Sequence, residues 1–411
     1  MKILFLNSYD NRGGAAKATL RIFESVNKFA NVEVSILVKK KETMHSQILE
    51  YDSIFTKVNS FFEKILKKLF LKNNNTIFSF PIFMASDLHR AIKKLEPDLI
   101  HIHWINDGFF QISDLTNITQ PILWTLHDDW PFTGGCHLTH GCMKYLDACR
   151  ECPHTKFVDL TSSTLIKKKK YLLKSNISIC APSEWLMHKS LSSNLFKHSY
   201  HFHIPNPIDI DFFSKNRLAN NFSEHKPKKT ILFGANNFDE DSNKGFKILL
   251  QALSIIDSNN FTLAVFGNKI KLDLKDYSFK IIDLGKIYDE KLLIDVYSSA
   301  DFIVVPSLQE NFSNIILESM SCSLPVIAFN VGGNSDLILH KINGYLCKNI
   351  SYQDLADGID WMLHTKKLEN LSTSSRKYVE ENFTYKKISS KYLNAYKKIL
   401  ALKDIKNTQF S

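Results

Sequence analysis

The sequence predicts an α/β protein with two Rossmann-like domains, each built on a parallel sheet. Short apolar, β-branched runs alternate with segments of helical periodicity in both halves of the chain, which is typical of strand–helix–strand units. The segment His203–Asp209 contains two prolines and separates the halves, because it cannot lie inside a helix or strand. At 411 residues the chain is also too long for one small core. We expect a first domain over 1–203, a second over 204–385, and a terminal helix and tail over 386–411.

The bulk composition is that of an ordinary globular protein, with 44% hydrophobic and 23% charged residues. No apolar run approaches the length of a membrane span. The apolar part of Met1–Asn7 is too short for a signal peptide, so we expect a cytoplasmic location. The net charge of +10 favours anionic partners such as nucleic acid, anionic lipid or phosphorylated ligands. The alternative is that lysine simply populates the surface.

The first domain begins with a strand over Lys2–Ser8, a glycine-containing loop and a helix. This arrangement starts a Rossmann-like half but lacks the Gly-x-Gly-x-x-Gly motif, so NAD is not indicated. Gly13 and Gly14 would let the backbone come close to a ligand, because neither has a Cβ. The alternative is a simple tight turn.

Residues 54–70 have the clearest helical periodicity of the chain, with an aromatic-rich apolar face and lysines on the opposite face. Two interpretations follow. The helix could lie in the interface of an anionic membrane, or its apolar face could pack on the core of the domain.

A predicted strand over Pro121–Leu126 ends at His127. A histidine at the carboxyl end of a parallel strand is well placed for handling protons or binding a polar group. His101 and His103 fall inside the predicted strand Asp98–Trp104, and we interpret them as structural.

Four cysteines follow within a short insertion over residues 134–154, and in a reducing compartment they argue against disulfides. They make a candidate structural zinc site, for which His137, His140 and His154 could compete as ligands. The alternative is a loop of reduced or redox-labile thiols. The four are Cys136, Cys142, Cys149 and Cys152.

In the second domain, two carboxylates flank a predicted strand-to-helix junction. Glu310 follows the apolar run Ala300–Val305, and Glu318 lies in the helix after it, with Ser313 as the expected N-cap. The backbone N–H groups near Phe312–Asn314 would start that helix, and a helix N-terminus attracts phosphate. The carboxylates could accept hydrogen bonds from sugar hydroxyls on either side of such a phosphate.

Further motifs accompany this junction in order: Lys244–Gly245, Asn330–Gly333 and Asn343–Tyr345. With them the chain resembles, over nearly its whole length, the GT-B retaining glycosyltransferases of glycosyltransferase family 4. The segment Trp130–Cys136, with its later cysteines, is similar to the subgroup that builds bacterial exopolysaccharides such as colanic acid. The resemblance implies two Rossmann-like domains facing a cleft and a C-terminal helix that crosses back to the first domain.

The resemblance also implies roles for particular residues. Glu318 would hold the ribose hydroxyls of a nucleotide, and Glu310 would lie beside the transferred sugar. Lys244 would bind the diphosphate together with the amides near Phe312, Ser313 and Asn314. Gly13 and Gly14 would lie near the donor phosphate and the acceptor, and His127 would face the donor sugar.

One departure from the family concerns the charge at the diphosphate. The family usually has an arginine shortly after the strand glycine, whereas Ala235, Asn236 and Asn237 follow Gly234 here. Lys244 and the helix N-terminus would then carry more of the neutralisation, and no metal or other cofactor is expected for catalysis. We interpret Asp239–Asp241 as solvated.

We therefore expect a retaining glycosyltransferase of the hexosyltransferase type. It would move a sugar from a nucleotide-sugar to a lipid-linked glycan acceptor in bacterial surface or exopolysaccharide biosynthesis at the inner face of the membrane. The first alternative is a GT-B epimerase or phosphorylase, although no pyridoxal phosphate lysine is identifiable. The second is a non-enzymatic zinc- and nucleic-acid-binding protein. We expect no nucleic-acid partner, because the aromatics do not interleave with a basic stripe.

Overall fold

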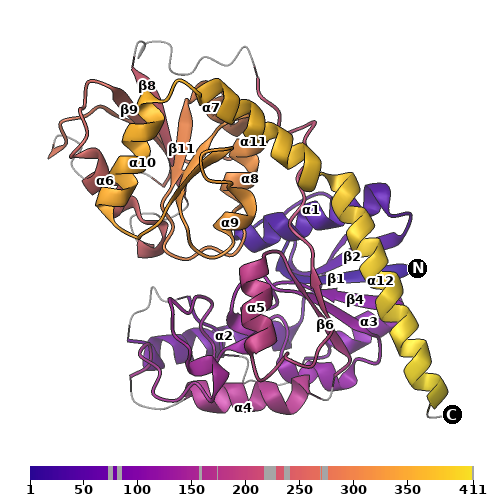
Figure 1. Ribbon diagram of the computed structural model, residues 1–411. Helices are drawn as coiled ribbons and strands as arrows, with labels where there is room; N and C mark the ends of the chain where they lie inside the picture. Colours follow the sequence, from indigo (N-terminus) through magenta and orange to yellow (C-terminus); the bar gives the residue numbers. More distant parts are fainter. Residues whose placement is uncertain are drawn as a thin grey trace. The chain divides into compact units, whose positions relative to one another are not determined.

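The computed structural model describes residues 1–72, 77–80, 86–156, 160–173, 175–216, 228–235, 241–268, 270 and 276–409, with the backbone alone from 403. The chain forms two compact units (Figure 1). Unit 1 comprises Met1–Pro207 and Tyr385–Ser411, and unit 2 comprises Ile208–Thr384. The chain therefore leaves unit 1 after Pro207 and returns to it at Tyr385.

Unit 1 is built on a seven-stranded sheet in the order β3-β2-β1-β4-β5-β6-β7. Every neighbouring pair is parallel. The chain adds β2 and β3 on one side of β1 and β4 to β7 on the other, so the order reverses between β1 and β4. The strands are β1 (Lys2–Tyr9), β2 (Glu33–Lys40), β3 (Ile48–Glu50), β4 (Leu99–Ile102), β5 (Ile122–Thr125), β6 (Ile177–Ala181) and β7 (His201–His203).

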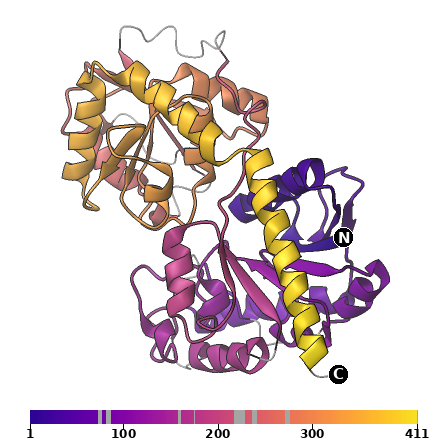
Figure 2. The ribbon, with the colours of Figure 1, turned by 45° about the vertical axis from the view of Figure 1, so that its right-hand side comes forward.

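Helices cover both faces of this sheet because the strands are apolar on both sides. In β1, Ile3 and Phe5 pack with α1 (Gly13–Phe29) and α12 (Tyr385–Gln409). Leu4 and Leu6 point to the other face, in a cluster with residues of three further helices. The three further helices on that other face are α3 (Leu88–Leu95), α4 (Leu160–Leu172) and α5 (Glu184–Ser192). Figures 1 and 2 both show α12 lying beside α1.

Unit 2 repeats this architecture with a six-stranded parallel sheet in the order β10-β9-β8-β11-β12-β13. Its order reverses between β8 and β11, and apolar clusters lie on both faces. The strands are β8 (Lys229–Ala235), β9 (Phe261–Gly267), β10 (Ile281–Gly285), β11 (Phe302–Val305), β12 (Val326–Phe329) and β13 (Gly344–Cys347). The helices are α6 (Phe246–Leu253), α7 (Glu290–Ser299), α8 (Asn314–Ser321), α9 (Asn334–Leu337), α10 (Tyr352–His364) and α11 (Leu368–Asn382).

The predicted fold class is confirmed, since both halves form doubly wound parallel sheets. The terminal helix α12 begins at Tyr385, one residue before the expected 386, and the preceding helix α11 ends at Asn382. Within the described ranges, no helix combines the length and the apolar character that crossing a membrane requires.

Helix α2 (Ile54–Phe70) has the predicted bounds but an unexpected orientation. Its buried residues are polar, and large apolar residues such as Phe61 and Phe62 are exposed. The interpretation that the apolar face packs on the core of the domain is therefore wrong.

Candidate functional site

Each sheet has one point where the strand order reverses, and open α/β folds bind ligands at the carboxyl ends of the strands there. In unit 2 this point lies between β8 and β11, whose following loops carry Lys244 and Glu310. In unit 1 it lies between β1 and β4, which precede the Gly13–Gly14 loop and Trp104. The predicted residues Lys244 and Glu310 thus follow strands at the reversal point of unit 2, and Gly13 and Gly14 follow one at the reversal point of unit 1, whereas His127 follows the neighbouring strand β5.

Asn243 joins the two loops at the reversal point of unit 2. Its side-chain amide donates to the carbonyl of Gln309 at 2.9 Å and accepts from the N–H of Gln309 at 2.9 Å. Its own carbonyl accepts from the N–H of Leu308 at 2.8 Å. The side chain of Asn243 is buried, and its hydrogen bonds hold the two loops together. Lys244, which follows Asn243, therefore lies beside Glu310, which follows Gln309.

Lys244 and Glu310 form an ion pair, with 3.6 Å between Nζ and Oε2. The Glu310 carboxylate is the main cause that raises the pKa of Lys244 above its ordinary value, and Asp241 adds to the effect. The lysine is therefore protonated at neutral pH. Both side chains keep some exposure, 30% for Lys244 and 20% for Glu310, so an incoming anion can reach the cation.

Two glycines fix the backbone around this pair. Gly245 has a φ of +68°, and a Cβ there would lie 2.0 Å from the carbonyl oxygen of Pro306. Gly332 has a φ of +56°, and a Cβ there would lie 1.7 Å from the carbonyl oxygen of Glu310. The N–H of Gly333 donates to that same oxygen at 3.1 Å. The loop after β12 therefore holds the backbone of Glu310 through a close approach that only glycine permits.

Helix α8 begins where the sequence predicts. Ser313 is the N-cap, and its hydroxyl accepts from the N–H of Ile316. The first-turn N–H groups of a helix lack intrahelical partners and carry partial positive charge. The side chain of Phe312 is not part of this polar edge, because it is buried against Phe383 with ring centroids 5.7 Å apart. Only its backbone could contact a ligand.

Glu318 lies in α8 but is only 2% exposed. Its Oε2 accepts a hydrogen bond of 3.0 Å from the hydroxyl of Tyr297, on α7. The two carboxylates of the predicted pair thus differ in surroundings, since Glu310 is in an ion pair at the loop and Glu318 is buried. The family's arginine would lie shortly after Gly234, where this chain has Asn236 and Asn237, and these two residues lie outside the described residues. Asp239 and Glu240 lie outside them as well.

In unit 1, the Gly13–Gly14 loop is exposed at the start of α1. A Cβ at Gly13 would meet no atom within 4 Å, so its φ of +82° rather than crowding is what favours glycine. Nearby strand ends carry a polar cluster. The Asp107 carboxylate is hydrogen-bonded to the hydroxyl of Tyr9 and accepts from Lys39 Nζ at 2.8 Å.

Three histidine rings lie in a row across β4 and β5. The ring centroids of His101 and His103 are 4.1 Å apart, and those of His103 and His127 are 5.3 Å apart. Nδ1 of His103 shares a 3.0 Å hydrogen bond with Nε2 of His127. Burial lowers the pKa of His127 to about 4 and that of both other histidines well below 6.5. All three imidazoles are neutral at pH 7.

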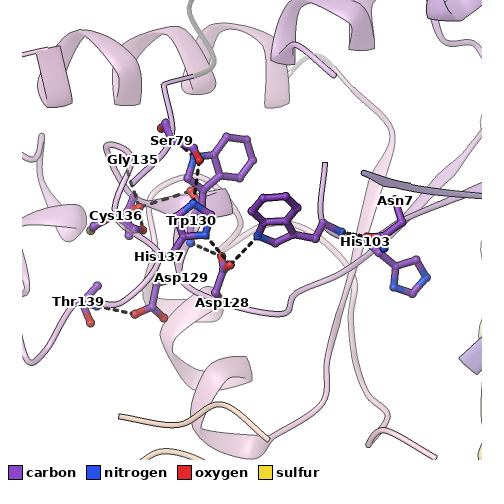
Figure 3. A network of polar contacts seen from close by, with 12 residues as sticks. Asn7, Ser79, His103, Asp128, Asp129, Trp130, Gly135, Cys136, His137 and Thr139 are labelled. Carbon is purple, nitrogen blue, oxygen red and sulfur yellow. Dashed lines mark hydrogen bonds and ion pairs between the residues drawn. The ribbon is translucent and has the colours of Figure 1, made fainter. Parts of the chain in front are cut away.

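The residue after His127 is the centre of a polar network (Figure 3). The Asp128 carboxylate accepts from Nδ1 of His137 at 2.6 Å, a contact drawn in Figure 3, and from Nε1 of Trp104 at 3.2 Å. It also accepts from the N–H of Trp130 at 2.9 Å. His137 is the strongest cause that lowers the pKa of Asp128, against the opposing effect of burial. The carboxylate therefore orients an indole at the carboxyl edge of the sheet.

The cysteine-rich insertion is fixed by other groups. Gly134 donates its N–H to Sγ of Cys149 at 3.2 Å, and burial raises the pKa of Cys149 to about 11 and that of Cys136 to about 12. In the part of the chain that the structure describes, no three His, Cys, Asp or Glu side chains gather to hold a metal ion. Zinc at Cys136, Cys142, Cys149 and Cys152 therefore stays a prediction.

Sequence reasoning missed several residues that shape these sites. Asn243 and Asp128 gave no signal by themselves, because their partners lie far away in the sequence. His103 had one: it follows β4 as His127 follows β5, and these strands are adjacent in the sheet. The end of two neighbouring parallel strands is a position where side chains meet, so His103 is a partner of His127 as well as a structural residue.

A comparison with protein families finds a similarity within unit 2. Residues 228–365 match the family model described as glycosyl transferases group 1. The matched residues include Lys244, Glu310 and Glu318, and the β8–β11 reversal point.

Similar sequences include an uncharacterized glycosyltransferase, MJ1607, of Methanocaldococcus jannaschii, 29% identical over 38% of this chain and 42% of that protein. The capsular polysaccharide biosynthesis glycosyltransferase CapM of Staphylococcus aureus is 28% identical over 52% of this chain and 61% of its own length. The putative colanic acid biosynthesis glycosyl transferase WcaC of Escherichia coli is 22% identical over 66% and 68%. The chain thus spans between 42 and 61% of the first two relatives.

Solved structures match the whole fold. Sucrose-phosphate synthase of Thermosynechococcus elongatus superposes with a TM-score of 0.71 at 18% identity, covering 98% of this chain and 99% of that one. HepE of Anabaena, in complex with UDP-glucose, superposes with a TM-score of 0.66 at 16% identity, covering 97% and 100%. These likenesses establish the GT-B architecture.

Proposed function

We propose that the chain is a glycosyltransferase that moves a sugar from a nucleoside-diphosphate sugar to a glycan. The observation that supports this most directly is the Lys244–Glu310 pair beside the start of α8, at the point where the strand order of unit 2 reverses. The glycosyl transferases group 1 match covers the same residues. The sequence relatives that are named above are glycosyltransferases, and one structural neighbour was solved with UDP-glucose.

In this proposal, the diphosphate of the donor binds between Lys244 and the first-turn N–H groups of α8. The lysine supplies a full positive charge, and the helix N-terminus supplies partial positive charge. When the donor binds, the ammonium group of Lys244 exchanges its ion pair with Glu310 for contacts with phosphate oxygens. The Glu310 carboxylate then lies beside the sugar. Glu318 holds the ribose hydroxyls, as the family resemblance implies, after its hydrogen bond with Tyr297 rearranges.

The reaction breaks the bond between the anomeric carbon and a diphosphate oxygen, and forms a bond from that carbon to an acceptor hydroxyl oxygen. The acceptor proton passes to the leaving diphosphate. Negative charge grows on the leaving oxygens, where Lys244 and α8 stabilise it. We propose retention of configuration by attack on the face from which the diphosphate leaves, with Glu310 stabilising the developing positive charge on the sugar.

The acceptor in this proposal is a lipid-linked glycan of a bacterial surface or exopolysaccharide. CapM and WcaC, which are named for capsular polysaccharide and colanic acid biosynthesis, support this class. Unit 1 would contribute the Gly13–Gly14 backbone and His127. Because His127 is neutral at pH 7, it would contact a sugar hydroxyl through a hydrogen bond rather than through charge.

The test begins with a panel of nucleotide sugars in a thermal-shift assay, because a ligand that binds the folded state raises the unfolding midpoint. Glu310→Gln is then compared with wild type for binding of the best donor and for transfer. We expect binding within a few-fold and turnover reduced by roughly 100-fold or more, because a transition-state interaction is lost. Glu369→Gln, an exposed glutamate of α11, is the matched control and should change neither.

Two results would overturn the proposal. One is full turnover by Glu310→Gln, which would remove the role of the carboxylate. The other is a panel in which no nucleotide sugar raises the midpoint of the wild-type chain. A donor that is epimerised in the absence of any acceptor would instead support the epimerase alternative.

A further inference from the structure

Helix α2 is amphipathic, but it is oriented opposite to an ordinary surface helix. Its buried residues are Thr56, Asn59, Ser60 and Glu63, all polar. Its exposed residues include Ile54 at 71%, Phe61 at 61% and Leu69 at 57% of their full exposure. A contiguous exposed apolar patch on a water-soluble surface marks a site of interaction.

Helical geometry separates the two faces cleanly. At about 100° per residue, the polar buried residues lie along one stripe, and the exposed apolar residues lie along the opposite stripe. Phe61 and Phe62 also contact each other edge to face, with ring centroids 5.8 Å apart. We define the apolar stripe of α2 as Ile54, Val58, Phe61, Phe62, Ile65 and Leu69, which are all exposed.

The polar stripe is bonded to unit 1, so the helix cannot simply roll over to bury its apolar stripe. The hydroxyl of Ser60 donates to the backbone carbonyl of Asp107 at 2.7 Å and accepts from Lys39 Nζ at 2.8 Å. Gly108, with a φ of +73°, packs closely against Ser60. A Cβ on residue 108 would lie 2.4 Å from the backbone nitrogen of Ser60. The exposure of the apolar stripe is therefore built into the fold of the unit.

We propose that the apolar stripe of α2 lies in the interface of an anionic lipid bilayer. Charge selects this occupant. Lys57, Lys64 and Lys68 are exposed along one flank of the stripe, and Lys72 is exposed just beyond the helix. An apolar helix face beside a row of lysines has the composition of a helix that lies in the plane of an anionic membrane surface.

The position of α2 also connects the membrane with the acceptor side of the proposed reaction. Asp107, which Ser60 contacts, is hydrogen-bonded to Tyr9 and Lys39. Tyr9 ends β1 and Asp107 follows β4, the two strands at the reversal point of unit 1. A bilayer on the outer side of α2 would bring lipid-linked molecules to the same unit. This consequence rests on the proposed function, but the membrane contact itself does not.

The experiment measures co-sedimentation of the purified full chain with two kinds of vesicle, phosphatidylcholine alone and phosphatidylcholine mixed with phosphatidylglycerol. The test variants are Phe61→Gln/Phe62→Gln and Lys57→Gln/Lys64→Gln/Lys68→Gln. The matched control is Ile166→Gln/Leu173→Gln in the same unit, because Ile166 on α4 is 63% exposed and Leu173 is 55% exposed. Since the substituted side chains are exposed, all variants should keep the thermal midpoint of the wild type.

We expect wild type and control to bind the anionic vesicles and to bind phosphatidylcholine weakly. The phenylalanine variant should lose binding by more than tenfold, and the lysine variant by roughly fivefold for each charge removed. Binding should also weaken as salt is raised. Donor binding by the thermal-shift assay should be the same in all variants, so a failure here would leave the proposed transferase activity intact.

Absence of vesicle binding by wild type, or equal loss in the control, would overturn the proposal. So would a concentration-dependent dimer that Phe61→Gln/Phe62→Gln dissociates without any vesicle binding, because the stripe would then be covered by a second copy of the chain.

Discussion

At the scale of single residues, His127 is held neutral by its surroundings. Burial lowers its pKa to about 4, and its Nε2 shares a hydrogen bond with His103, whose pKa burial also lowers. Asp128 opposes the shift without overcoming it. A base with a lowered pKa stabilises the folded state fully above its ordinary pKa of about 6.5, and that stability is lost as the pH falls toward 4.

The pH dependence of unfolding should therefore differ between wild type and His127→Asn. Between pH 6.5 and 4 we expect the free energy of unfolding of the wild type to fall by up to about 3 kcal/mol relative to the variant. Denaturant titrations at several pH values measure this difference, in which the ionisable groups that do not interact with His127 cancel. His188→Asn, an exposed histidine of the same unit, is the control. Parallel pH profiles for wild type and His127→Asn would show that the ring is not held neutral.

At the scale of elements, the loop after β12 contacts the loop after β11 and holds the backbone of Glu310 in place. Gly332 and Gly285 both have positive φ, +56° and +62°, but a Cβ meets the carbonyl oxygen of Glu310 at the first and nothing within 4 Å at the second. Alanine at either position costs about 1 kcal/mol of backbone strain. Only Gly332→Ala must also displace the backbone of Glu310.

We therefore expect Gly332→Ala to reduce donor affinity and turnover, and to lower the free energy of unfolding by about 2 to 4 kcal/mol. Gly285→Ala should lose only about 1 kcal/mol and keep normal donor binding. Thermal shift with the best donor and denaturant unfolding measure the two effects. Equal donor affinity in both variants would mean that the contact between the two loops does not position Glu310.

The elements also mark how far the sequence predicts this molecule. The bounds of α2 and the N-cap at Ser313 follow from local patterns, and the structure agrees with both. Periodicity could not tell which stripe of α2 is buried, because the decision depends on Lys39 and Asp107, which are distant in the sequence. The three-residue strands β3 and β7 are too short to have a period. The local pattern predicted Glu310 and the family resemblance implied Lys244, but the support of these residues by Gly332 and Asn243 is a tertiary contact.

At the scale of the whole molecule, the chain crosses between its units twice, and the second crossing gives α12 to unit 1. This helix completes one face of the first sheet. Tyr396 is buried there and its hydroxyl shares a 2.9 Å hydrogen bond with His101, while Ser25 donates to the carbonyl of Tyr385 at 2.8 Å. Without α12, the apolar residues of α1 and β1 that pack against it would be exposed to water.

Unit 2, by contrast, has apolar clusters on both faces of its sheet that draw on its own residues alone. Its two ends are also paired, since Ile208 donates its N–H to the carbonyl of Phe383 at 2.9 Å. We expect residues 208–384 to fold alone with a cooperative thermal transition and to bind the donor within about tenfold of the full chain, because the proposed diphosphate contacts come from this unit. Residues 1–207 expressed without α12 should aggregate, and adding residues 385–411 through a flexible linker should restore solubility. Circular dichroism, light scattering and donor titration test the three expectations. If the isolated second unit folds but binds no nucleotide sugar, donor binding requires residues from unit 1, and the assignment of the whole donor site to unit 2 is wrong.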